Sequence, residues 1–202
     1  MKILKIYDNN INERHIQDAV EALREGHIVI YPTDSVYGLA ADALNKKAVE
    51  KLCRLKGLDP DKNLLSIVCS DLSQASEYVR INNAAFSVLK NYLPGAYTFV
   101  LPSSTRLPKI FKSRKTIGLR IPDNNIARAL AESLGNPLLT GSVDIDEAEP
   151  EAATEPENLA LTYANDVAVV IDGGHGGTIN STLVDITDPS DPVVLREGVA
   201  DF

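Results

Sequence analysis

The sequence has little of several features that mark common protein classes. It contains no tryptophan, one methionine, two cysteines and three histidines in 202 residues. No apolar run approaches the ~20 residues that a membrane-spanning helix needs, and the first residues lack the apolar core of a secretion signal. The cysteines and histidines have no metal-ligand spacing. These absences predict a cytoplasmic protein with reduced cysteines and no dedicated transition-metal site.

Motifs that cradle phosphate or activate a serine are also missing. There is no Walker loop, no strand-coupled G-x-G-x-x-G and no nucleophile elbow. The glycine-rich run 173–177 does follow a predicted strand, but another predicted strand comes next instead of a helix. We therefore expect a hairpin connection there, without a helix N-terminus to bind an anion.

Length and charge limit the organisation and the partners of the chain. A chain of 202 residues with 44% hydrophobic content is long enough for one well-filled core, which predicts a single domain over residues 1–202. The net charge of −8 argues against indiscriminate coating of nucleic acid. Local charge is uneven, because 106–120 carries six bases and no acid, whereas 144–157 carries seven acids and no base. Both runs are open to interpretation as solvated surface.

Helical spacing and strand-like runs alternate along the chain. Asn12 can cap the first helix, and Gly26 suits a left-handed position just past its end. Strands interleaved with helices predict an α/β layered fold, and the closing run of strands predicts that the sheet is mixed. The predicted strands are 4–7, 27–31, 40–44, 64–69, 97–101, 115–121, 137–143, 167–172, 181–186 and 192–195, and the predicted helices are 13–25, 48–55, 72–79, 84–93, 126–134 and 157–163.

The stretch 29–39 joins a predicted buried strand to a polar loop. Pro32 cannot donate a hydrogen bond to a sheet, so strand pairing should end there. We expect the polar side chains that follow, from Thr33 to Tyr37, to be exposed at the carboxyl end of the strand. In open α/β sheets this is where ligands bind.

Hydroxyls and cations recur at the ends of other predicted strands. Such groups suit a ligand that carries phosphate or carboxylate, since arginine forms paired hydrogen bonds to these oxygens. Any α/β protein has polar residues at strand ends, so spacing alone leaves a purely structural role open. The residues are Thr33, Ser35, Lys56, Thr116, Arg120, Thr140, Ser142, Ser181, Thr182 and Arg196.

Several of these residues lie in motifs that resemble a known family. The motifs are Pro-Thr-Asp-Ser-Val-Tyr-Gly-Leu at 32–39, Pro-Gly-Ala-Tyr-Thr at 94–98, Thr-Ile-Gly-Leu-Arg-Ile-Pro at 116–122, Ser-Thr at 181–182 and Leu-Arg-Glu-Gly at 195–198. In this order they resemble the YrdC-like family, which includes threonylcarbamoyl-AMP synthases, and they are most similar to its YciO branch. The resemblance implies a twisted mixed β-sheet flanked by helices, with a concave, positively charged cleft.

The resemblance also implies a reaction and its participants. The family joins L-threonine, bicarbonate and ATP into threonylcarbamoyl-AMP, which supplies a tRNA modification at adenosine. A carbamate attacks the α-phosphate, so the protein would position reactants and neutralise charge, with Mg²⁺ on the phosphates. By resemblance, the nucleotide would be bound by Lys56, Thr116, Ser142 and Arg196, threonine by Thr33, Arg120, Thr140 and Ser181, and the catalytic candidates are Lys56, Ser142 and Asp144.

Double-stranded RNA is a further partner that the resemblance implies. Duplex RNA is read mostly through its backbone and shape, which basic and hydroxyl side chains can contact. The candidate residues for this contact are Lys109, Lys112, Arg114, Lys115 and Arg120.

Two motifs depart from the synthases. Where those enzymes carry Lys-x-Arg and Ser-x-Asn, this chain reads Lys-Gly-Leu at 56–58 and Ser-Val-Asp at 142–144. A lost charge-assisted hydrogen bond to phosphate costs about 1.5–3 kcal/mol, and a carboxylate ~4 Å from a phosphate adds a repulsion of up to ~4 kcal/mol. Both changes oppose ATP binding. Three hypotheses follow: a slow or altered synthase, a non-catalytic RNA-binding or translation-associated paralogue, and a hydrolase of a threonylcarbamoyl compound with Asp144 as base.

Overall fold

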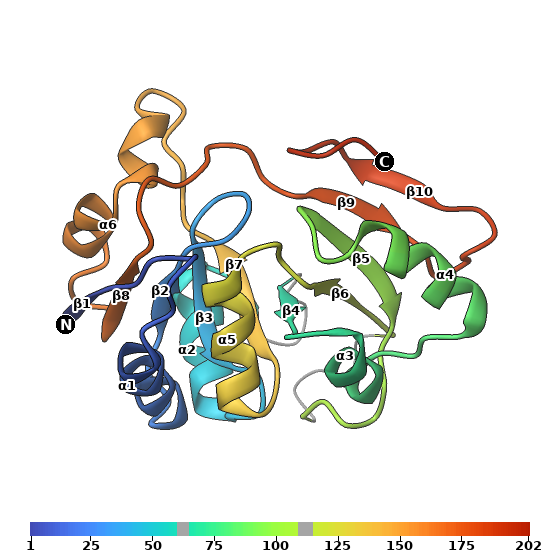
Figure 1. The fold of residues 1–202 in the computed structure, drawn as a ribbon, viewed down its shortest axis with the longest axis horizontal. Helices are drawn as coiled ribbons and strands as arrows, with labels where there is room; N and C mark the ends of the chain where they lie inside the picture. The colour runs from blue at the N-terminus through green and yellow to red at the C-terminus, as the bar shows by residue number, and fades with distance from the viewer. Residues whose placement is uncertain (60–64, 109–114) are drawn as a thin grey trace.

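One mixed β-sheet forms the frame of the protein. The computed structural model describes residues 1–59, 65–108 and 115–202. Its strands run in the spatial order β1-β8-β2-β3-β7-β4-β6-β5-β9-β10 (Figure 1). The strands are β1 (Lys2–Lys5), β2 (Val29–Tyr31), β3 (Gly38–Asp42), β4 (Ser66–Val68), β5 (Tyr97–Pro102), β6 (Thr116–Arg120), β7 (Leu138–Ser142), β8 (Val169–Asp172), β9 (Thr182–Asp185) and β10 (Val193–Arg196).

Parallel and antiparallel pairs both occur in this sheet, as the sequence predicts. β8 runs parallel to β1 and β2, whereas β3 is antiparallel to β2 and β7. Where β7 meets β4 the pairing is again antiparallel, with Ser66 opposite Thr140. We call β1, β8, β2, β3 and β7 the first half of the sheet, β4, β6, β5, β9 and β10 the second half, and the β7–β4 pairing the seam.

The helices are α1 (Glu13–Arg24), α2 (Lys46–Leu55), α3 (Leu72–Tyr78), α4 (Asn83–Tyr92), α5 (Asn125–Leu134) and α6 (Pro156–Thr162), with a 3₁₀ helix η2 (Pro150–Thr154) before α6. Both ends of α1 lie at the residues that the sequence predicts for caps. Asn12 accepts a hydrogen bond from His15 N at the start of α1, and Gly26 just beyond its end has a φ of +86°. In α5 the cap at the C-terminus is Gly135, with a φ of +82°.

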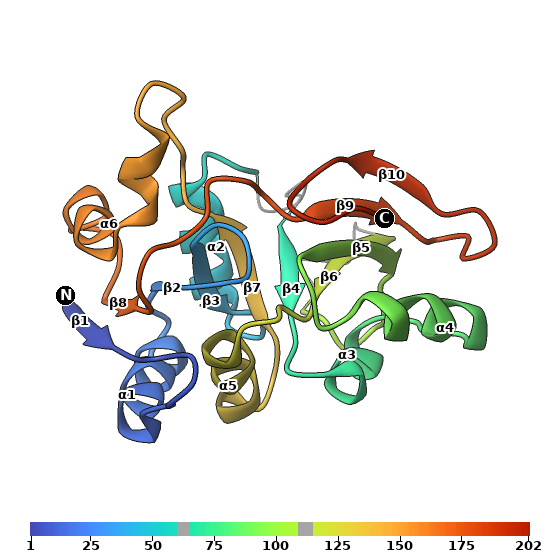
Figure 2. The ribbon, with the colours of Figure 1, turned by 45° about the horizontal axis from the view of Figure 1, so that its top comes forward.

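Helices cover both faces of the sheet (Figures 1 and 2). Successive residues of β2 point to opposite faces. Val29 and Tyr31 pack in a core with α1 and α5, whereas Ile28 and Ile30 belong to a larger core with α2 and α6. That larger core also includes Phe99 of β5 and buried residues of α3 and α4. The side chains at the seam are therefore held by packing from both faces.

The expected hairpin over the glycine-rich run is wrong. β8 pairs with β1 and β2, and β9 pairs with β5 and β10, so the two strands lie in different halves of the sheet. Residues 173–181 cross between the halves (Figure 2). Gly177 N donates to Ser35 O at 2.9 Å, and a Cβ at Gly177 would lie 2.5 Å from that same oxygen. The glycines therefore allow close backbone packing across the sheet instead of a tight turn.

Three further features bear on the sequence-based expectations. Cys53 and Cys69 are both buried and form no disulfide. None of the helices in the described ranges has the length and apolar character needed to span a bilayer. Likewise, no cluster of three or more metal-ligating side chains occurs among those residues.

Candidate functional site

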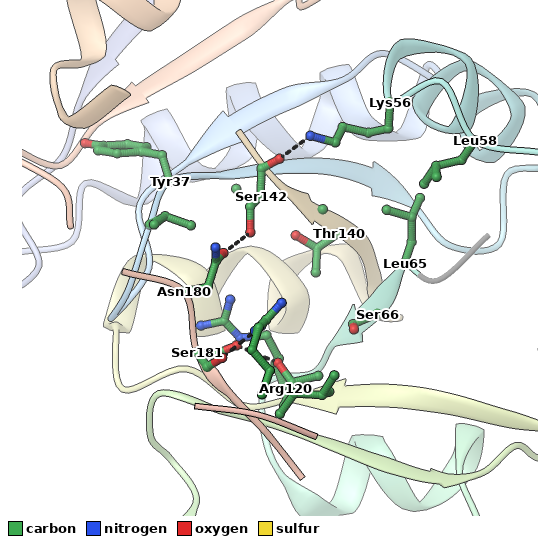
Figure 3. A pocket seen from close by; sticks show the side chains of 16 residues that line it. Tyr37, Lys56, Leu58, Leu65, Ser66, Arg120, Thr140, Ser142, Asn180 and Ser181 are labelled. Atoms are coloured by element: carbon green, nitrogen blue, oxygen red, sulfur yellow. Dashed lines mark hydrogen bonds between the residues drawn. The ribbon is translucent and has the colours of Figure 1, made fainter. Parts of the chain in front are cut away.

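A pocket of about 340 Å³ lies over the seam of the sheet (Figure 3). Its walls come from both halves, since β3 and β7 contribute on one side and β4, β5 and β6 on the other. Six of the sequence-predicted site residues line it together: Lys56, Arg120, Thr140, Ser142, Ser181 and Arg196.

Three of the residues that the family resemblance assigns to threonine binding, nucleotide binding or catalysis do not line the pocket. The Thr33 hydroxyl donates to Val36 O at 2.7 Å and lies 3.1 Å from Ser35 Oγ, so it is satisfied inside its own loop. Thr116 opens β6 and pairs with Pro102, four residues (~13 Å) along the strand from Arg120. Asp144 is mostly exposed and reaches the site only through Lys56.

The polar loop from Thr33 to Tyr37 is not exposed, contrary to the sequence-based expectation. Ser35 is 4% exposed and Tyr37 is 1% exposed. Tyr37 donates its hydroxyl to Gly174 O at 2.7 Å and accepts a bond from Gly173 N at 3.1 Å. Burial, above all, raises the pKa of Tyr37, so this hydroxyl stays protonated and continues to donate. Contacts with the crossing segment 173–181 satisfy the loop and bury it.

The basic run that we predicted as an RNA contact is only partly described. Lys109, Lys112 and Arg114 lie outside the described residues. Lys115 is exposed just before β6. Arg120 is instead 7% exposed and lies in the pocket, which separates it from the exposed part of the run.

Hydroxyls and one amide line the floor and walls of the pocket. Thr140 Oγ1 lies 2.8 Å from the Oη of the fully buried Tyr31, and Thr98 Oγ1 lies 2.7 Å from Ser181 Oγ. Ser142 donates to Asn180 Oδ1 at 2.6 Å. In this bond the Asn180 oxygen is occupied and its amide nitrogen is left at the pocket.

Sequence reasoning missed the amide and one hydroxyl of this group. Asn180 directly precedes the Ser-Thr motif at 181–182 but was not part of it, and the expected hairpin placed residue 180 in the connection between two strands. Thr98 lay in the motif at 94–98, where its partner Ser181 could not be foreseen from spacing.

Lys56 is fixed at one end of the pocket by residues of β7 and the loop after it. It follows the last turn of α2, and its Nζ donates to Ser142 O at 2.8 Å. The same nitrogen forms an ion pair with Asp144 Oδ1. Asp144 is in turn anchored, because its N donates to Tyr163 Oη at 2.9 Å and Tyr163 donates back to Oδ2 at 3.2 Å.

Tyr163 is suited to anchor that carboxylate. It is 4% exposed at the end of α6. Burial is the main cause that raises the pKa of Tyr163 to about 12, and the charge of Asp144 adds to the rise. The phenol therefore remains a donor to Asp144 at neutral pH.

Two arginines lie at the other end of the pocket. Arg120 Nη2 donates to Asp34 Oδ1 at 2.8 Å and to Ser35 Oγ at 3.0 Å, while its buried Nε has no hydrogen-bond partner. Arg196 Nη2 donates to Ser181 O at 2.8 Å. Burial and the nearby charge of Arg120 both lower the pKa of Arg196. An unpartnered guanidinium N–H beside a second guanidinium suits a bound carboxylate or phosphate oxygen.

The sequence of the chain also matches a known protein family. The family model of Sua5, YciO and YrdC proteins, described as telomere recombination, matches residues 21–198. The chain belongs to this family. Its match covers the strands of the seam and every pocket residue discussed above.

Relatives with solved structures share the whole fold. YciO of Escherichia coli K12 is 40% identical over 198 residues, covering 97% of this chain and 95% of that protein. The E. coli YciO crystal structure covers 100% of this chain and 98% of its own, with a TM-score of 0.89. The Pyrococcus abyssi Sua5 structure in complex with L-threonine is 32% identical with a TM-score of 0.86, covering 98% of this chain and 58% of that one.

An enzyme is also among the relatives. The threonylcarbamoyl-AMP synthase of Bacillus subtilis is 33% identical over 191 residues, which cover 93% of this chain and 54% of that enzyme. Of these relatives YciO is the more similar to this chain, which spans about half the length of the B. subtilis and P. abyssi synthases. A twisted mixed sheet flanked by helices, as in YciO and Sua5, is confirmed.

Proposed function

We propose that the pocket binds an adenylate together with a small amino acid of the L-threonine type, as a YciO-type cleft related to threonylcarbamoyl-AMP synthesis. The observation that carries this proposal is the convergence of Lys56, Ser142, Thr140, Arg120, Ser181 and Arg196 on one cavity. These residues come from both halves of the sheet, which a set of ordinary strand-end polar residues would not require. The likeness to a Sua5 structure that contains L-threonine supports the amino-acid part.

The two ends of the pocket suggest how a ligand is oriented. Arg120 and Arg196 would bind a carboxylate, and Ser181 and Thr140 would contact a side-chain hydroxyl between them. Lys56 and Ser142 would face the phosphate end of an adenylate. A carbamate formed on the amino acid would then lie between the two ends, and the protein would act by positioning and charge neutralisation.

Magnesium would accompany the phosphates of the nucleotide. Mg²⁺ usually keeps several waters and is held by one or two carboxylates plus substrate phosphates. Asp144 is the carboxylate near Lys56, and it is engaged by Lys56 and Tyr163. The proposed ion would therefore be held mainly by the ligand. If a nucleotide bound without Mg²⁺, the cations of the pocket would neutralise its phosphates.

The contacts of Asp144 also argue against a hydrolase. One oxygen is bound to Lys56 and the other accepts from Tyr163. A carboxylate engaged in this way is poorly placed to take a proton from water. We therefore favour a ligand-binding or slow synthase site over a hydrolase.

Thermal unfolding with ligands tests the proposal. A ligand that binds only the folded state raises its stability, by about 2.7 kcal/mol at a concentration of 100 Kd. ATP, adenosine, L-threonine and threonylcarbamoyl-AMP should each be compared with no ligand. We expect protection by threonylcarbamoyl-AMP in the wild type and a reduced effect in Lys56→Ala, whereas Lys47→Ala on the exposed side of α2 should match the wild type. No protection by any of the four would contradict the proposal.

Synthase activity has a separate readout. Labelled ATP with L-threonine, bicarbonate and Mg²⁺ should release pyrophosphate slowly if the altered motifs weaken but do not abolish the reaction. If the wild type releases pyrophosphate no faster than Lys56→Ala, synthase activity is excluded. Ligand binding is then decided by the thermal assay alone.

RNA binding at the basic run is the second function that we propose. Its support is the basic run with Lys115 exposed beside β6. Replacing Lys112, Arg114 and Lys115 by alanine should weaken binding of duplex RNA and make it less dependent on salt. Unchanged RNA affinity, or affinity that salt does not alter, would count against it.

A further inference from the structure

A carboxylate from the chain itself is bound to the lysine of the pocket. Lys56 Nζ is shared between Ser142 O and Asp144 Oδ1, and the lysine side chain is only 16% exposed. The Asp144 side chain is 72% exposed, so exposure alone would assign it to the solvated surface. Its contacts show otherwise, because a buried side chain holds it in place.

Tyr163 is that buried side chain. It bonds Asp144 twice, accepting from the backbone N at 2.9 Å and donating to Oδ2 at 3.2 Å. These bonds fix both the main chain and the carboxylate, leaving Oδ1 directed at Lys56. An exposed ion pair normally loses much of its strength to side-chain freedom. Here that freedom is reduced by the packing of α6.

The charges around the pocket are nearly balanced as a result. Within the described ranges, three cations line it, namely Lys56, Arg120 and Arg196, and no carboxylate does. Two of these cations carry a carboxylate partner from the chain: Asp144 on Lys56 and Asp34 on Arg120. Arg196 bonds a backbone carbonyl instead. Three positive charges against two negative ones leave a single unit of positive charge.

We infer that Asp144, held by Tyr163, is a built-in counter-ion that makes the pocket select a ligand of low negative charge over a nucleoside triphosphate. This inference rests on the proposed function and specifies the charge class of its ligand. A ligand carboxylate can neutralise Arg196 and use the unpartnered Nε of Arg120 without disturbing Lys56. A triphosphate must either displace Asp144 from Lys56 or place its phosphates beside that carboxylate.

Expected affinities follow from this arrangement. In the wild type, phosphates added to adenosine should bring no gain at Lys56, because the lysine is already paired. A hydrogen bond between charged groups is worth roughly 10- to 150-fold in affinity. Releasing Lys56 should therefore tighten the binding of ATP by about tenfold or more and change that of adenosine little.

Calorimetric titration of adenosine, AMP, ADP and ATP, without Mg²⁺ and at one salt concentration, tests the inference. In Asp144→Asn the ratio of the adenosine to the ATP dissociation constant should rise about tenfold or more over the wild-type ratio. Tyr163→Phe should raise it in the same direction but by less, because the carboxylate remains and only its anchoring is lost. Glu147→Gln removes an equal charge from the same acidic segment and should leave the ratio at the wild-type value.

The possible outcomes distinguish the inference from the proposed function. An unchanged ratio in Asp144→Asn, with clear binding in both proteins, would overturn the counter-ion role and leave the nucleotide site standing. An equal rise in Glu147→Gln would also overturn it, since the effect would then be general charge. Failure of all four compounds to bind either protein would overturn the nucleotide site itself, and the counter-ion role with it.

Discussion

Arg120 and Asp34 form an ion pair in the wall of the pocket, with Nη2 2.8 Å from Oδ1 and side chains that are 8% and 10% exposed. Asp34 also accepts from Asp123 N at 2.7 Å, so one carboxylate joins the loop after β2 to the turn after β6. This pair ties the first half of the sheet to the second. It also explains why the loop from Thr33 to Tyr37 is folded inward.

Replacing Asp34 by alanine should destabilise the protein strongly. Removal of one partner leaves the charge of Arg120 buried and uncompensated, which typically costs about 3–5 kcal/mol. Urea unfolding of Asp34→Ala measures the change in the free energy of unfolding. Asp123→Ala is the matched control, because its carboxylate pairs with Arg128 on the surface and such pairs are worth about 0–1 kcal/mol. Similar losses in the two variants would contradict this role for the buried pair.

Tyr31→Phe should show how much the buried hydrogen bond between Tyr31 and Thr140 contributes to the free energy of unfolding. Tyr31 is 0% exposed and Thr140 is 5% exposed, so the phenylalanine would leave the threonine hydroxyl without its partner. The expected loss of unfolding free energy is about 1–3 kcal/mol. In a double-mutant cycle with Thr140→Val, the double variant should lose less than the sum of the single variants. Strict additivity would show that the two hydroxyls do not interact.

Gly198→Ala should distort the pocket from outside it. A Cβ there would lie 2.3 Å from Asn180 O and 2.4 Å from both Ser181 C and Thr182 N. The backbone of the pocket wall would have to move, and such overpacking typically costs about 1–3 kcal/mol. We expect lower stability and weaker ligand protection in the thermal assay. Val199→Ala, an exposed change in the same segment, should affect neither; equal effects would place the cause in the segment as a whole.

A pH-dependent contact connects the acidic segment to the crossing segment. His175 Nδ1 lies 2.7 Å from Glu155 Oε1, and Nε2 lies 3.4 Å from Glu151 Oε2. The hydrogen bond with Glu155 is the largest cause that raises the pKa of His175 above its ordinary value. A folded-state pKa above the unfolded one stabilises the fold fully below about pH 6.5, and that contribution is lost as the pH rises through the folded-state pKa.

Glu155→Gln should therefore remove a pH-dependent part of the stability. The melting temperature of the variant should fall below that of the wild type in mild acid, and the gap should close as the pH increases. An NMR titration should show the His175 pKa moving down in the variant. Glu147→Gln should leave this titration unchanged. A gap that widens at higher pH would have the wrong sign for this mechanism.

Local signals in the sequence were sufficient to predict most of the helices and strands. Asn12, Gly26 and Gly135 mark helix ends through capping and left-handed backbone, which depend on neighbouring residues only. Pro32 ends strand β2 after Tyr31, as its missing N–H requires. Such effects are readable from the sequence because no distant contact is needed to produce them.

Long-range pairing could not be read in the same way. Two strand-like runs separated by a glycine-rich run satisfied the pattern of a hairpin, yet β9 pairs with β5, whose residues lie over 80 positions earlier. The burial of Ser35 and Tyr37 depends on that crossing, because Gly174 and Gly177 bond this loop. The site residues Lys56 and Arg196 were already among the polar candidates read from the sequence, and the family resemblance gave them roles. Asn180 and Tyr163 acquire their roles only in three dimensions.

The position of the two chain ends has a practical consequence for experiments. β1 forms one edge of the sheet and β10 the other, so the ends lie on opposite sides of the molecule (Figure 1). The last residues pack on the second half of the sheet, where Thr182 Oγ1 donates to Ala200 O, Tyr97 donates to Asp201 O, and the Phe202 ring lies 4.6 Å from that of Tyr92. An affinity tag or fluorescent label fused after Phe202 would start at this aromatic contact and disturb the packing of β5. The same label placed before Met1 would stand at the far edge and report on the protein without touching its site.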